Sequence, residues 1–506
     1  MGSDGLESVI FKTCAEELSY PLYLIFCKSL DTGVVPDLWR KSEICPIHKK
    51  GPSNLVENFR PVNLTQIPSK GFESLLKKAL TSHLDAQNLF SVEQHGFLKG
   101  RSCQSNILEC KEEWTRILDE GDWVDVVYFD YKMAFDSVNH HLLIEKLKWY
   151  GISGKIIKWM EAFLSNRFQR VKIGNAKSSW RRVLSGTTQG SVIGVILFIL
   201  YINDLPHKGL NGPTPRSQKE TKIKLLADDT KAFRRISKSQ PSADADELQK
   251  AIDDICEWSE IWQMKIHPDK TKVLHLGNEN PKREYGINGK KIAKTDLEKD
   301  IGFLMNETLT SSNHVSKNRS RALGEIATIR RSFDYLDENT FKLLYNQKIR
   351  PHLEWGSIAT PPDSRAEATT LERVQSKATH LLKNLGHLSA EERRKRLNLF
   401  ALDHRRVRGD LLEVYKITKG LTRINHNQFW EITASRNGPI LKKEQVGPNR
   451  HGRGLKQRTA FFSYRVIKPW NWLPKELKES GSLDIFKRGL DALMKTTNWS
   501  DFVQQL

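Results

Sequence analysis

Three aspartates lie where strand ends and turns are predicted, and such positions expose side chains. The apolar segment 123–129 predicts a strand that leads directly into Asp130, and segment 223–233 predicts a hairpin with Asp228 and Asp229 at its tip. If the two segments are neighbours in one sheet, the three carboxylates converge. Turns also favour aspartate without any function, so the pair at the hairpin tip, taken alone, is explained by turn chemistry.

The residue types indicate which chemistry such a cluster would support. Carboxylates without histidine or cysteine ligands suit a hard octahedral ion, Mg²⁺ or Mn²⁺. Two such ions, about 3.5–4 Å apart, activate an attacking hydroxyl and stabilise a leaving pyrophosphate. The three aspartates therefore predict a two-metal site for phosphoryl transfer.

The surrounding elements must bring these residues together. A Gly-rich loop, 185–194, separates the two acidic segments and opens onto an apolar helix at 192–202. After about residue 310 strand signals fade. The other expected elements are helices at 7–30, 69–86, 102–118, 139–165, 314–332, 338–350, 364–384 and 403–419, a basic strand-loop-strand at 44–64, and a linker-like stretch at 435–460.

The composition indicates which kind of binding partner the protein favours. The 506 residues include 38% hydrophobic residues, 13 Trp and 21 Phe, which excludes wholesale disorder, and the net charge of +20 favours polyanions. Residues 301–506 hold 36 basic and 21 acidic side chains, so +15 of this charge lies in the C-terminal part.

Cysteine spacing and hydropathy exclude other classes of protein. Six cysteines without a C-x-x-C pair indicate neither a zinc ribbon nor a disulfide framework, and the longest apolar run, 11 residues at 192–202, is too short to span a membrane. We find no signal peptide. We therefore expect an intracellular protein of the nucleus and cytoplasm, not secreted, with no membrane partner.

Several motifs, in their order, resemble the reverse transcriptases of non-LTR retrotransposons, especially the jockey and chicken-repeat-1 type. Segment 128–138 (YFDYKMAFDSV) is similar to the first palm motif, 185–194 (SGTTQGSVIG) to the S-G-x-P-Q-G-S-x-L-G loop, and 226–229 (LADD) to the Y/F-A-D-D hairpin. Segments 46–51, 58–61 and 94–97 resemble the finger motifs, and 299–302 resembles the segment that closes the domain. The likeness covers nearly the whole chain.

The resemblance implies an α+β fold, a right-hand polymerase with fingers, a palm whose antiparallel sheet carries the catalytic aspartates, and a helical thumb. A mostly helical, basic region would follow the thumb. The implied divisions are a helical N-terminal extension at 1–43, a reverse transcriptase domain at 44–305 (fingers 44–120, palm 121–305), a thumb-like region at 306–425 and the basic C-terminal region at 426–506.

The same resemblance implies roles for individual residues. Asp130 and Asp228 would bind two Mg²⁺ or Mn²⁺ ions, with Asp229 completing the cluster. Phe135, five residues after Asp130, would be the steric gate against a ribonucleotide 2′-OH, although core packing also explains an aromatic residue there. The remaining nucleotide contacts would be Lys49 or Lys50 and Arg60 on the triphosphate, Gln189 and Gly190 beside the nascent base pair, and Lys270 as the proton donor to pyrophosphate.

The C-terminal region offers a second candidate binding surface. Between 441 and 470 there are eight basic residues and one acid, Glu444. We expect Arg450, Arg453, Lys456 and Arg458 to contact nucleic-acid phosphates. The aromatic residues at 461–472 would stack on bases if exposed, or pack a small core; packing is the expectation for most of them.

The implied function is an RNA-directed DNA polymerase that adds dNTPs to a DNA primer or target on an RNA template. The endonuclease of full elements would have to come from elsewhere, because the chain begins close to the polymerase. Three departures, Thr188, Val195 and Leu226, keep an alternative open: a catalytically decayed remnant that only binds nucleic acid. A protein-interaction role for the helices after 310 also stays open.

Overall fold

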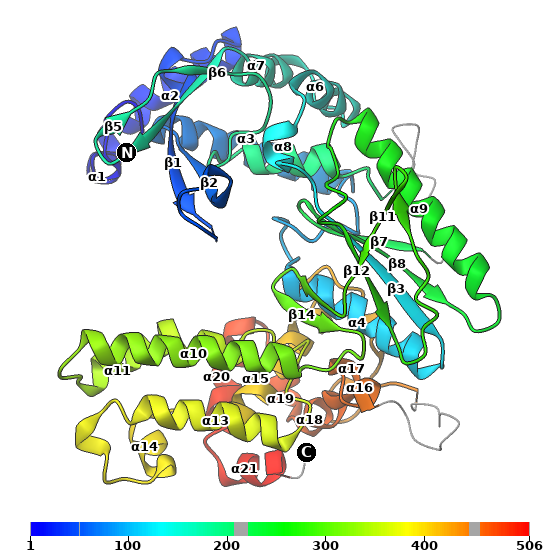
Figure 1. The fold of residues 1–506 in the computed structure, drawn as a ribbon. Helices are drawn as coiled ribbons and strands as arrows, with labels where there is room; N and C mark the ends of the chain where they lie inside the picture. The colour runs from blue at the N-terminus through cyan, green and yellow to red at the C-terminus, as the bar shows by residue number, and fades with distance from the viewer. Residues whose placement is uncertain (1, 50, 207–220, 445–455, 505–506) are drawn as a thin grey trace.

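The structure is a computed structural model that describes residues 2–49, 51–206, 221–444 and 456–504 (Figure 1). Lys50, Arg450 and Arg453, which were expected to contact nucleotide or nucleic acid, lie outside the described residues.

A five-stranded sheet forms the palm, with strand order β12-β9-β3-β8-β7. Its central strand β3 (Trp123–Phe129) is antiparallel to both β8 (Asp229–Ile236) and β9 (Lys272–Leu276), and β8 is antiparallel to β7 (Lys222–Leu226). The short β12 (Ala293–Lys294) adds a parallel edge to β9. The predicted strand before Asp130 and the predicted hairpin are thus neighbours in one sheet.

Both faces of the palm sheet are buried, which explains why β3 is almost continuously apolar. Val127 and Phe129 face a core that includes α8 (Gly194–Ile202) and α9 (Pro241–Ile261). On the opposite face, Val124 and Val126 join a second core with α4 (Cys103–Asp119) and residues from the last hundred of the chain.

A second sheet forms the fingers and combines two segments that are distant in sequence. Strands β1 (Lys41–His48) and β2 (Phe59–Leu64) form the expected basic hairpin, and β1 is parallel to β4 (Arg167–Ile173). β5 (Ala176–Lys177) and β6 (Arg181–Val183) pair antiparallel with β4. Residues 167–183, which fall within the range expected for the palm, therefore extend the fingers sheet.

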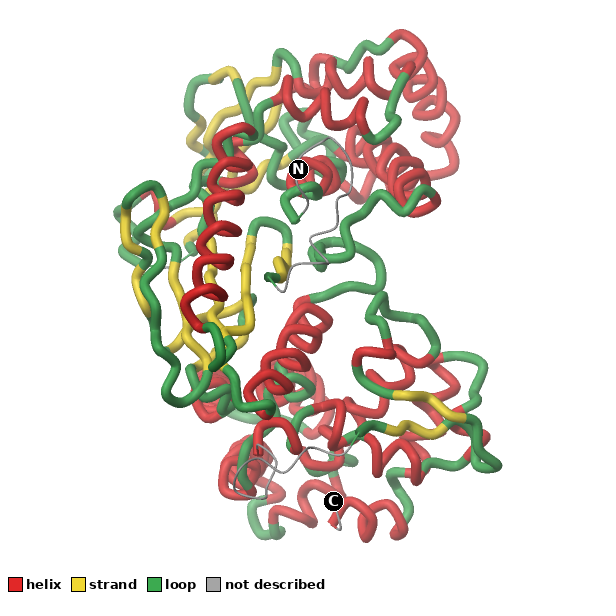
Figure 2. Tube along the Cα trace, turned by 90° about the vertical axis from the view of Figure 1, so that its right-hand side faces the viewer, coloured by secondary structure: helices red, strands yellow, loops and turns green. Residues whose placement is uncertain are grey.

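The second half of the chain is mostly helical (Figure 2). α10 (Ser312–Ser332), α11 (Glu338–Leu344) and α13 (Arg365–Thr379) enclose a third core, while α15 (Leu402–Thr418) packs with the C-terminal helices in the second. The other helices are α1 Ser8–Thr13, α2 Ala15–Thr32, α3 Ile67–Ala86, α5 Ala134–Ser137, α6 His140–Trp149, α7 Gly154–Leu164, α12 Arg350–Glu354, α14 Ala390–Arg396, α16 Lys456–Thr459, α17 Phe462–Arg465, α18 Ile467–Trp472, α19 Lys475–Lys478, α20 Leu483–Leu493 and α21 Thr497–Gln504.

Short strands complete the fold. They are β10 Gly286–Ile287, β11 Lys290–Lys291, β13 Leu297–Asp300, β14 Phe303–Asn306, β15 Glu431–Thr433 and β16 Ile440–Lys442.

The single helix expected at 139–165 is in fact two helices, α6 and α7. Gly151 between them has φ +77°, a left-handed conformation that favours glycine and ends α6. Asn139 caps the N-terminus of α6 through its side-chain oxygen. None of the described helices combines the length and apolar composition that crossing a membrane requires.

Candidate active site

The register of the palm sheet places the three aspartates at one end. Phe129 pairs with Thr230, so Asp130, which follows Phe129, lies level with Asp229 at the start of β8. Asp228 occupies the turn between β7 and β8, immediately beside Asp229. The structure thus brings together the three carboxylates singled out from the sequence.

The electrostatic surroundings show that negative charge is concentrated here. Burial raises the pKa of Asp228, and the negative charge of Asp130 raises it further, while Lys49 and Arg60 lower it. Burial, followed by the charges of Asp228 and Asp300, raises the pKa of Asp229 to about 6. A bound cation would favour the ionised form of these two carboxyls and so lower their pKa values.

The carboxylates at this end of the palm sheet offer oxygen ligands, which fit Mg²⁺ or Mn²⁺. Within the described residues, no group of three His, Cys, Asp or Glu side chains is arranged closely enough to hold an ion as it stands. The charges of Asp130 and Asp228 act on each other and on Asp229, so the three carboxylates are near one another and fit a shared ion. Their roles as ion ligands stay predictions.

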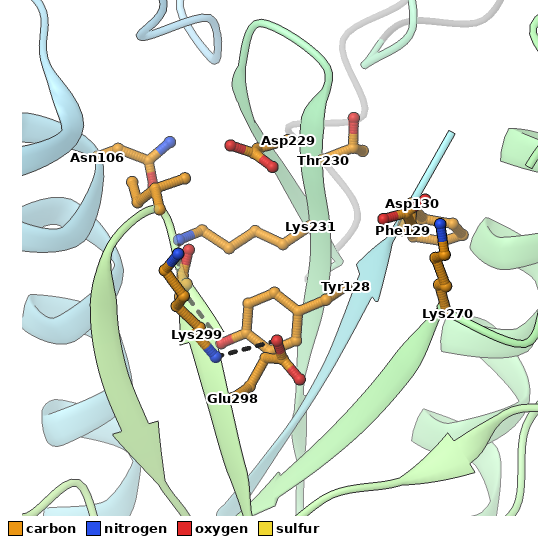
Figure 3. A pocket seen from close by; sticks show the side chains of 12 residues that line it. Asn106, Tyr128, Phe129, Asp130, Asp229, Thr230, Lys231, Lys270, Glu298 and Lys299 are labelled. Carbon is orange, nitrogen blue, oxygen red and sulfur yellow. Dashed lines mark hydrogen bonds and ion pairs between the residues drawn. The ribbon is translucent and has the colours of Figure 1, made fainter. Parts of the chain in front are cut away.

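Asp229 also lines a cavity of about 160 Å³ on the α4 side of the palm sheet, together with Asp130 and Lys270 (Figure 3). Below it, Lys231 forms an ion pair of 2.5 Å with Asp300, and the Tyr128 hydroxyl donates to the same carboxylate at 3.3 Å. These three residues join the palm sheet to the β13–β14 hairpin. Sequence reasoning missed them as a group, although Tyr128 and Lys231 each lie two residues from an aspartate, a spacing that puts them on the same sheet face.

The amine of Lys270 lies beside Asp130 in Figure 3. The backbone explains this placement: the His267 amide donates to the Asp130 carbonyl at 2.7 Å, and the Lys270 amide donates to the His267 carbonyl at 3.1 Å. This turn holds the exposed Lys270 at the cavity that Asp130 also lines. Its role as a proton donor stays a prediction.

A buried glutamine supports the turn of the β7–β8 hairpin. Ala227 has φ +57°, which is unfavourable for a residue with a Cβ. The Gln94 side-chain oxygen accepts hydrogen bonds from the Ala227 amide at 2.9 Å and the Gly96 amide at 2.7 Å. A Cβ on Gly96 would lie 2.5 Å from the Ala227 nitrogen, so only glycine allows this approach. The finger-like motif 94–97 thus braces the turn that carries Asp228.

The Gly-rich loop 185–194 packs between the palm and fingers. The Thr187 amide donates to the Phe135 carbonyl at 2.8 Å, and the Asn63 amide donates to the Gln189 carbonyl at 2.8 Å. Gly190 has φ +114°, and a Cβ there would lie 2.5 Å from the Asn63 oxygen. Two of the predicted nucleotide contacts, Gln189 and Gly190, are therefore fixed against β2.

The start of helix α8, which follows this loop, is also fixed. The buried Glu73 carboxylate accepts hydrogen bonds from the Val192 and Ile193 amides at 2.8 and 3.1 Å. Thr188, one of the departures from the family pattern, accepts a hydrogen bond from the Ser191 amide at 3.0 Å through its carbonyl. A backbone hydrogen bond therefore closes this turn of the loop, although Thr188 stands where the family pattern has proline.

Phe135 lies on α5 and stacks on Phe198 of α8, with ring centroids 4.0 Å apart. It is only partly buried, so packing and a steric gate are compatible. Lys49 and Arg60 are exposed on the β1–β2 hairpin and act electrostatically on Asp228, as triphosphate contacts would require.

One residue of the expected C-terminal binding surface, Arg458, is not placed as predicted. Arg458 is buried: its guanidinium forms a 2.7 Å ion pair with Glu112 of α4, so it is not available to nucleic acid. Phe461, Phe462 and Trp470 are also buried and pack the second core. Of the four predicted residues, Lys456 is the one that is described and exposed.

This fold, with carboxylates at one end of a mostly antiparallel sheet that faces a cationic fingers hairpin, is that of a right-hand nucleic-acid polymerase. The family model described as "Reverse transcriptase (RNA-dependent DNA polymerase)" matches residues 47–336. The chain therefore belongs to the reverse transcriptase family.

Two curated relatives come from Drosophila melanogaster. The probable RNA-directed DNA polymerase from transposon X-element is 24% identical over 387 residues, covering 75% of this chain and 42% of that protein. The RNA-directed DNA polymerase from mobile element jockey is 26% identical over 318 residues, covering 62% and 34%. The chain thus spans less than half the length of these relatives. Among solved structures, an apo telomerase from Candida tropicalis is 12% identical with a TM-score of 0.40, covering 73% of this chain and 63% of that one.

Proposed function

We propose that this chain is an RNA-directed DNA polymerase of the non-LTR retrotransposon type, which adds dNTPs to a DNA 3′ end on an RNA template. The observation that carries the proposal is the placement of Asp130 and Asp228 at one end of the palm sheet, with Lys49 and Arg60 of the fingers acting electrostatically on Asp228. The attacking 3′-hydroxyl of the primer and the α-phosphate of the nucleotide, from which pyrophosphate leaves, would meet between these groups. Such an enzyme would work in the nucleus and cytoplasm, where its RNA and DNA substrates are found.

Each residue then has a task. Asp130 and Asp228 would hold two Mg²⁺ or Mn²⁺ ions, which when bound lower the pKa of the attacking hydroxyl and neutralise charge on the leaving pyrophosphate. Lys49 and Arg60 bind the triphosphate, Arg60 through its forked guanidinium. Phe135 excludes a 2′-OH. Lys270 donates a proton to pyrophosphate, a step worth roughly 10²–10⁴-fold in rate.

The alternative is a decayed copy that binds nucleic acid without catalysis. Retention of the three aspartates and the closed loop around Thr188 favour the enzyme. Primer extension on RNA and DNA templates with Mg²⁺ distinguishes the two. For the wild-type chain we expect extension on RNA; binding without extension would support the remnant.

Asp228→Asn should lower extension roughly 10³-fold, because a metal contributes several kcal/mol of transition-state stabilisation. RNA affinity should stay unchanged. Asp253→Asn on the exposed side of α9 is the matched control and should extend normally. Normal extension by Asp228→Asn would contradict the two-metal assignment.

A further inference from the structure

Helix α2 of the fingers carries apolar residues on every side, although it lies at the surface. The segment 18–27 (LSYPLYLIFC) contains no charged side chain. The structure describes the whole of α2, and Ser29 is the only residue of this helix that is buried. Because a helix that is apolar all round is normally buried, α2 is expected to have a partner that covers its exposed side.

The inner side of α2 is anchored to the rest of the fingers. The Phe26 ring packs against the Trp39 and Phe72 rings, with centroids 6.0 and 5.0 Å away. The Trp159 indole donates a hydrogen bond to the Ser29 hydroxyl at 3.0 Å. These contacts hold the helix in place, so its outer side is presented to solvent as a fixed surface.

The outer side of α2 carries a row of four exposed residues, Glu17, Tyr20, Leu24 and Lys28, which we call the α2 stripe. Their spacing of three or four residues places them on one face of the helix. Tyr20 is 66% and Leu24 49% exposed, and the Tyr23 ring lies beside the Tyr20 ring, with centroids 6.5 Å apart. The stripe is therefore an apolar patch with an acid at one end and a base at the other.

The two charges of the α2 stripe are available to a partner. Both Glu17 and Lys28 are exposed, and among the described residues neither side chain forms an ion pair or a hydrogen bond. The two residues are 11 positions apart in the sequence, which is about three turns of helix, so they lie on the same side of α2. A partner that meets the apolar patch therefore meets both charges as well.

The order of residues makes the α2 stripe complementary to a second copy of itself. In an antiparallel pair of α2 helices centred midway along the stripe, Glu17 of each copy lies level with Lys28 of the other, and Tyr20 lies nearly level with Leu24. A parallel pair would place like charges opposite each other, which is unfavourable. Charge complementarity thus selects both the partner and its orientation.

We propose that the α2 stripe is a dimerisation surface, on which a second copy of this chain binds with its α2 antiparallel to the first. Such a two-fold contact uses the same patch on both copies and closes at two. Because stable complexes bury about 1,200–2,000 Å², a contact centred on two single helices should be weak. The helix lies at the end of the fingers away from the palm sheet (Figure 1), and the inference does not rest on the proposed polymerase activity.

The test is sedimentation equilibrium of this chain over a range of concentrations, after nuclease treatment so that a shared nucleic acid cannot link two copies. The wild type should show a monomer–dimer equilibrium. Tyr20→Gln/Leu24→Gln removes the apolar contact and should raise the dissociation constant more than about 10-fold. The matched control, Tyr335→Gln/Leu343→Gln, changes the same residue types at positions that are 77% and 55% exposed beyond the palm, and should dimerise as the wild type does.

Charge reversal tests the orientation. Glu17→Lys alone and Lys28→Glu alone each place like charges opposite each other at two symmetric contacts, so each should raise the dissociation constant about 10-fold. The double variant Glu17→Lys/Lys28→Glu exchanges the charges within each pair and should dimerise nearly as tightly as the wild type. An equimolar mixture of the two single variants should form a heterodimer of similar affinity, because its opposed charges are again of opposite sign.

Recovery in the double variant and in the mixture also excludes misfolding as the cause of the losses, since both contain the same substitutions. A wild-type chain that stays monomeric at every concentration would overturn the proposal. A dimer that tolerates Tyr20→Gln/Leu24→Gln, or a double reversal that stays as weak as the single variants, would overturn it as well, because the contact would then lie elsewhere or have another orientation.

Discussion

Asp228 and Asp229 are consecutive residues in different surroundings. Asp228, in the turn, faces Asp130 and the cations Lys49 and Arg60 of the fingers. Asp229, the first residue of β8, shares the cavity side of the sheet with Lys231 and Asp300. Lys49 and Arg60 therefore act on Asp228, whereas Asp300 and Lys231 act on Asp229. The sequence predicted that both would lie at a hairpin tip, but the difference between them depends on residues 60 and 300, which are distant in sequence.

The raised pKa of Asp229 predicts a pH-dependent stability. A carboxyl whose pKa is higher in the folded state stabilises the fold below its ordinary pKa, and this contribution is lost as pH rises through about 6. In chelator, the melting temperature of the wild type should therefore fall relative to Asp229→Asn between pH 4 and 7. The effect should be modest because the side chain is partly open to solvent. If the melting temperatures of the two proteins change with pH in parallel, the prediction is contradicted. Addition of Mg²⁺ at pH 7 should raise the melting temperature of the wild type more than that of Asp229→Asn.

Phe135 predicts sugar selection. Phe135→Val should raise the ratio of ribonucleotide to deoxynucleotide incorporation, since the smaller side chain leaves room for a 2′-OH. Phe198→Leu removes the ring on which Phe135 stacks and leaves the Phe135 ring in place. This variant is the control for lost packing. Both ratios are measured by single-nucleotide extension. If the two variants change the ratio equally, Phe135 acts through packing alone.

At the scale of elements, local pattern predicted the strands and turns that carry the chemistry. The apolar run before Asp130 and the hairpin around Asp228 are both present because they are specified by neighbouring residues. The parallel pairing of β1 with β4 was not predicted, because more than a hundred residues separate these strands and nothing in either pattern selects its partner. The hydrogen bonds to Gln94 that support the hairpin turn were not predicted either, because Gln94 is also distant from the hairpin in sequence.

Gln94 predicts a positioning effect of the finger motif on catalysis. Gln94→Ala leaves the Ala227 and Gly96 amides without their acceptor, which should cost about 1–3 kcal/mol of stability for each group. Because Ala227 precedes Asp228, the maximum extension rate of the folded protein should also fall, by up to about 100-fold. Gln66→Ala removes another buried glutamine that lies away from the hairpin and should lower stability alone. Equal maximum extension rates for Gln94→Ala and Gln66→Ala would show that Gln94 does not position Asp228.

At the scale of the molecule, the polymerase and the region beyond its family match share one core. The family model ends at residue 336, yet Leu411, Trp430 and Phe486 pack in the same cluster as Val124 and Val126 of the palm. The sequence predicted a basic, linker-like stretch at 435–460. Its charge was evident, but the burial of Arg458 depends on Glu112, more than three hundred residues earlier in the chain.

Glu112 therefore predicts that the C-terminal region stabilises the palm. Its carboxylate binds Lys443 at 2.6 Å and Arg458 at 2.7 Å, and all three side chains are largely buried. Glu112→Ala would leave two buried cations without their partner and should destabilise the fold by about 3–5 kcal/mol in chemical denaturation. Glu338→Ala, which breaks an exposed ion pair with Arg396, should cost about 1 kcal/mol or less.

A second variant separates this structural role from nucleic-acid binding. Arg458→Met combined with Glu112→Met replaces one of the two buried ion pairs by apolar groups and leaves Lys443 without its carboxylate, so it should recover part of the stability that Glu112→Ala loses. If Arg458 contacts no phosphate, this pair should leave the salt dependence of RNA binding unchanged. A slope reduced by about 0.7–0.9 in the folded double variant would instead show that Arg458 reaches nucleic acid, and the C-terminal region would then bind the substrate as well as support the palm.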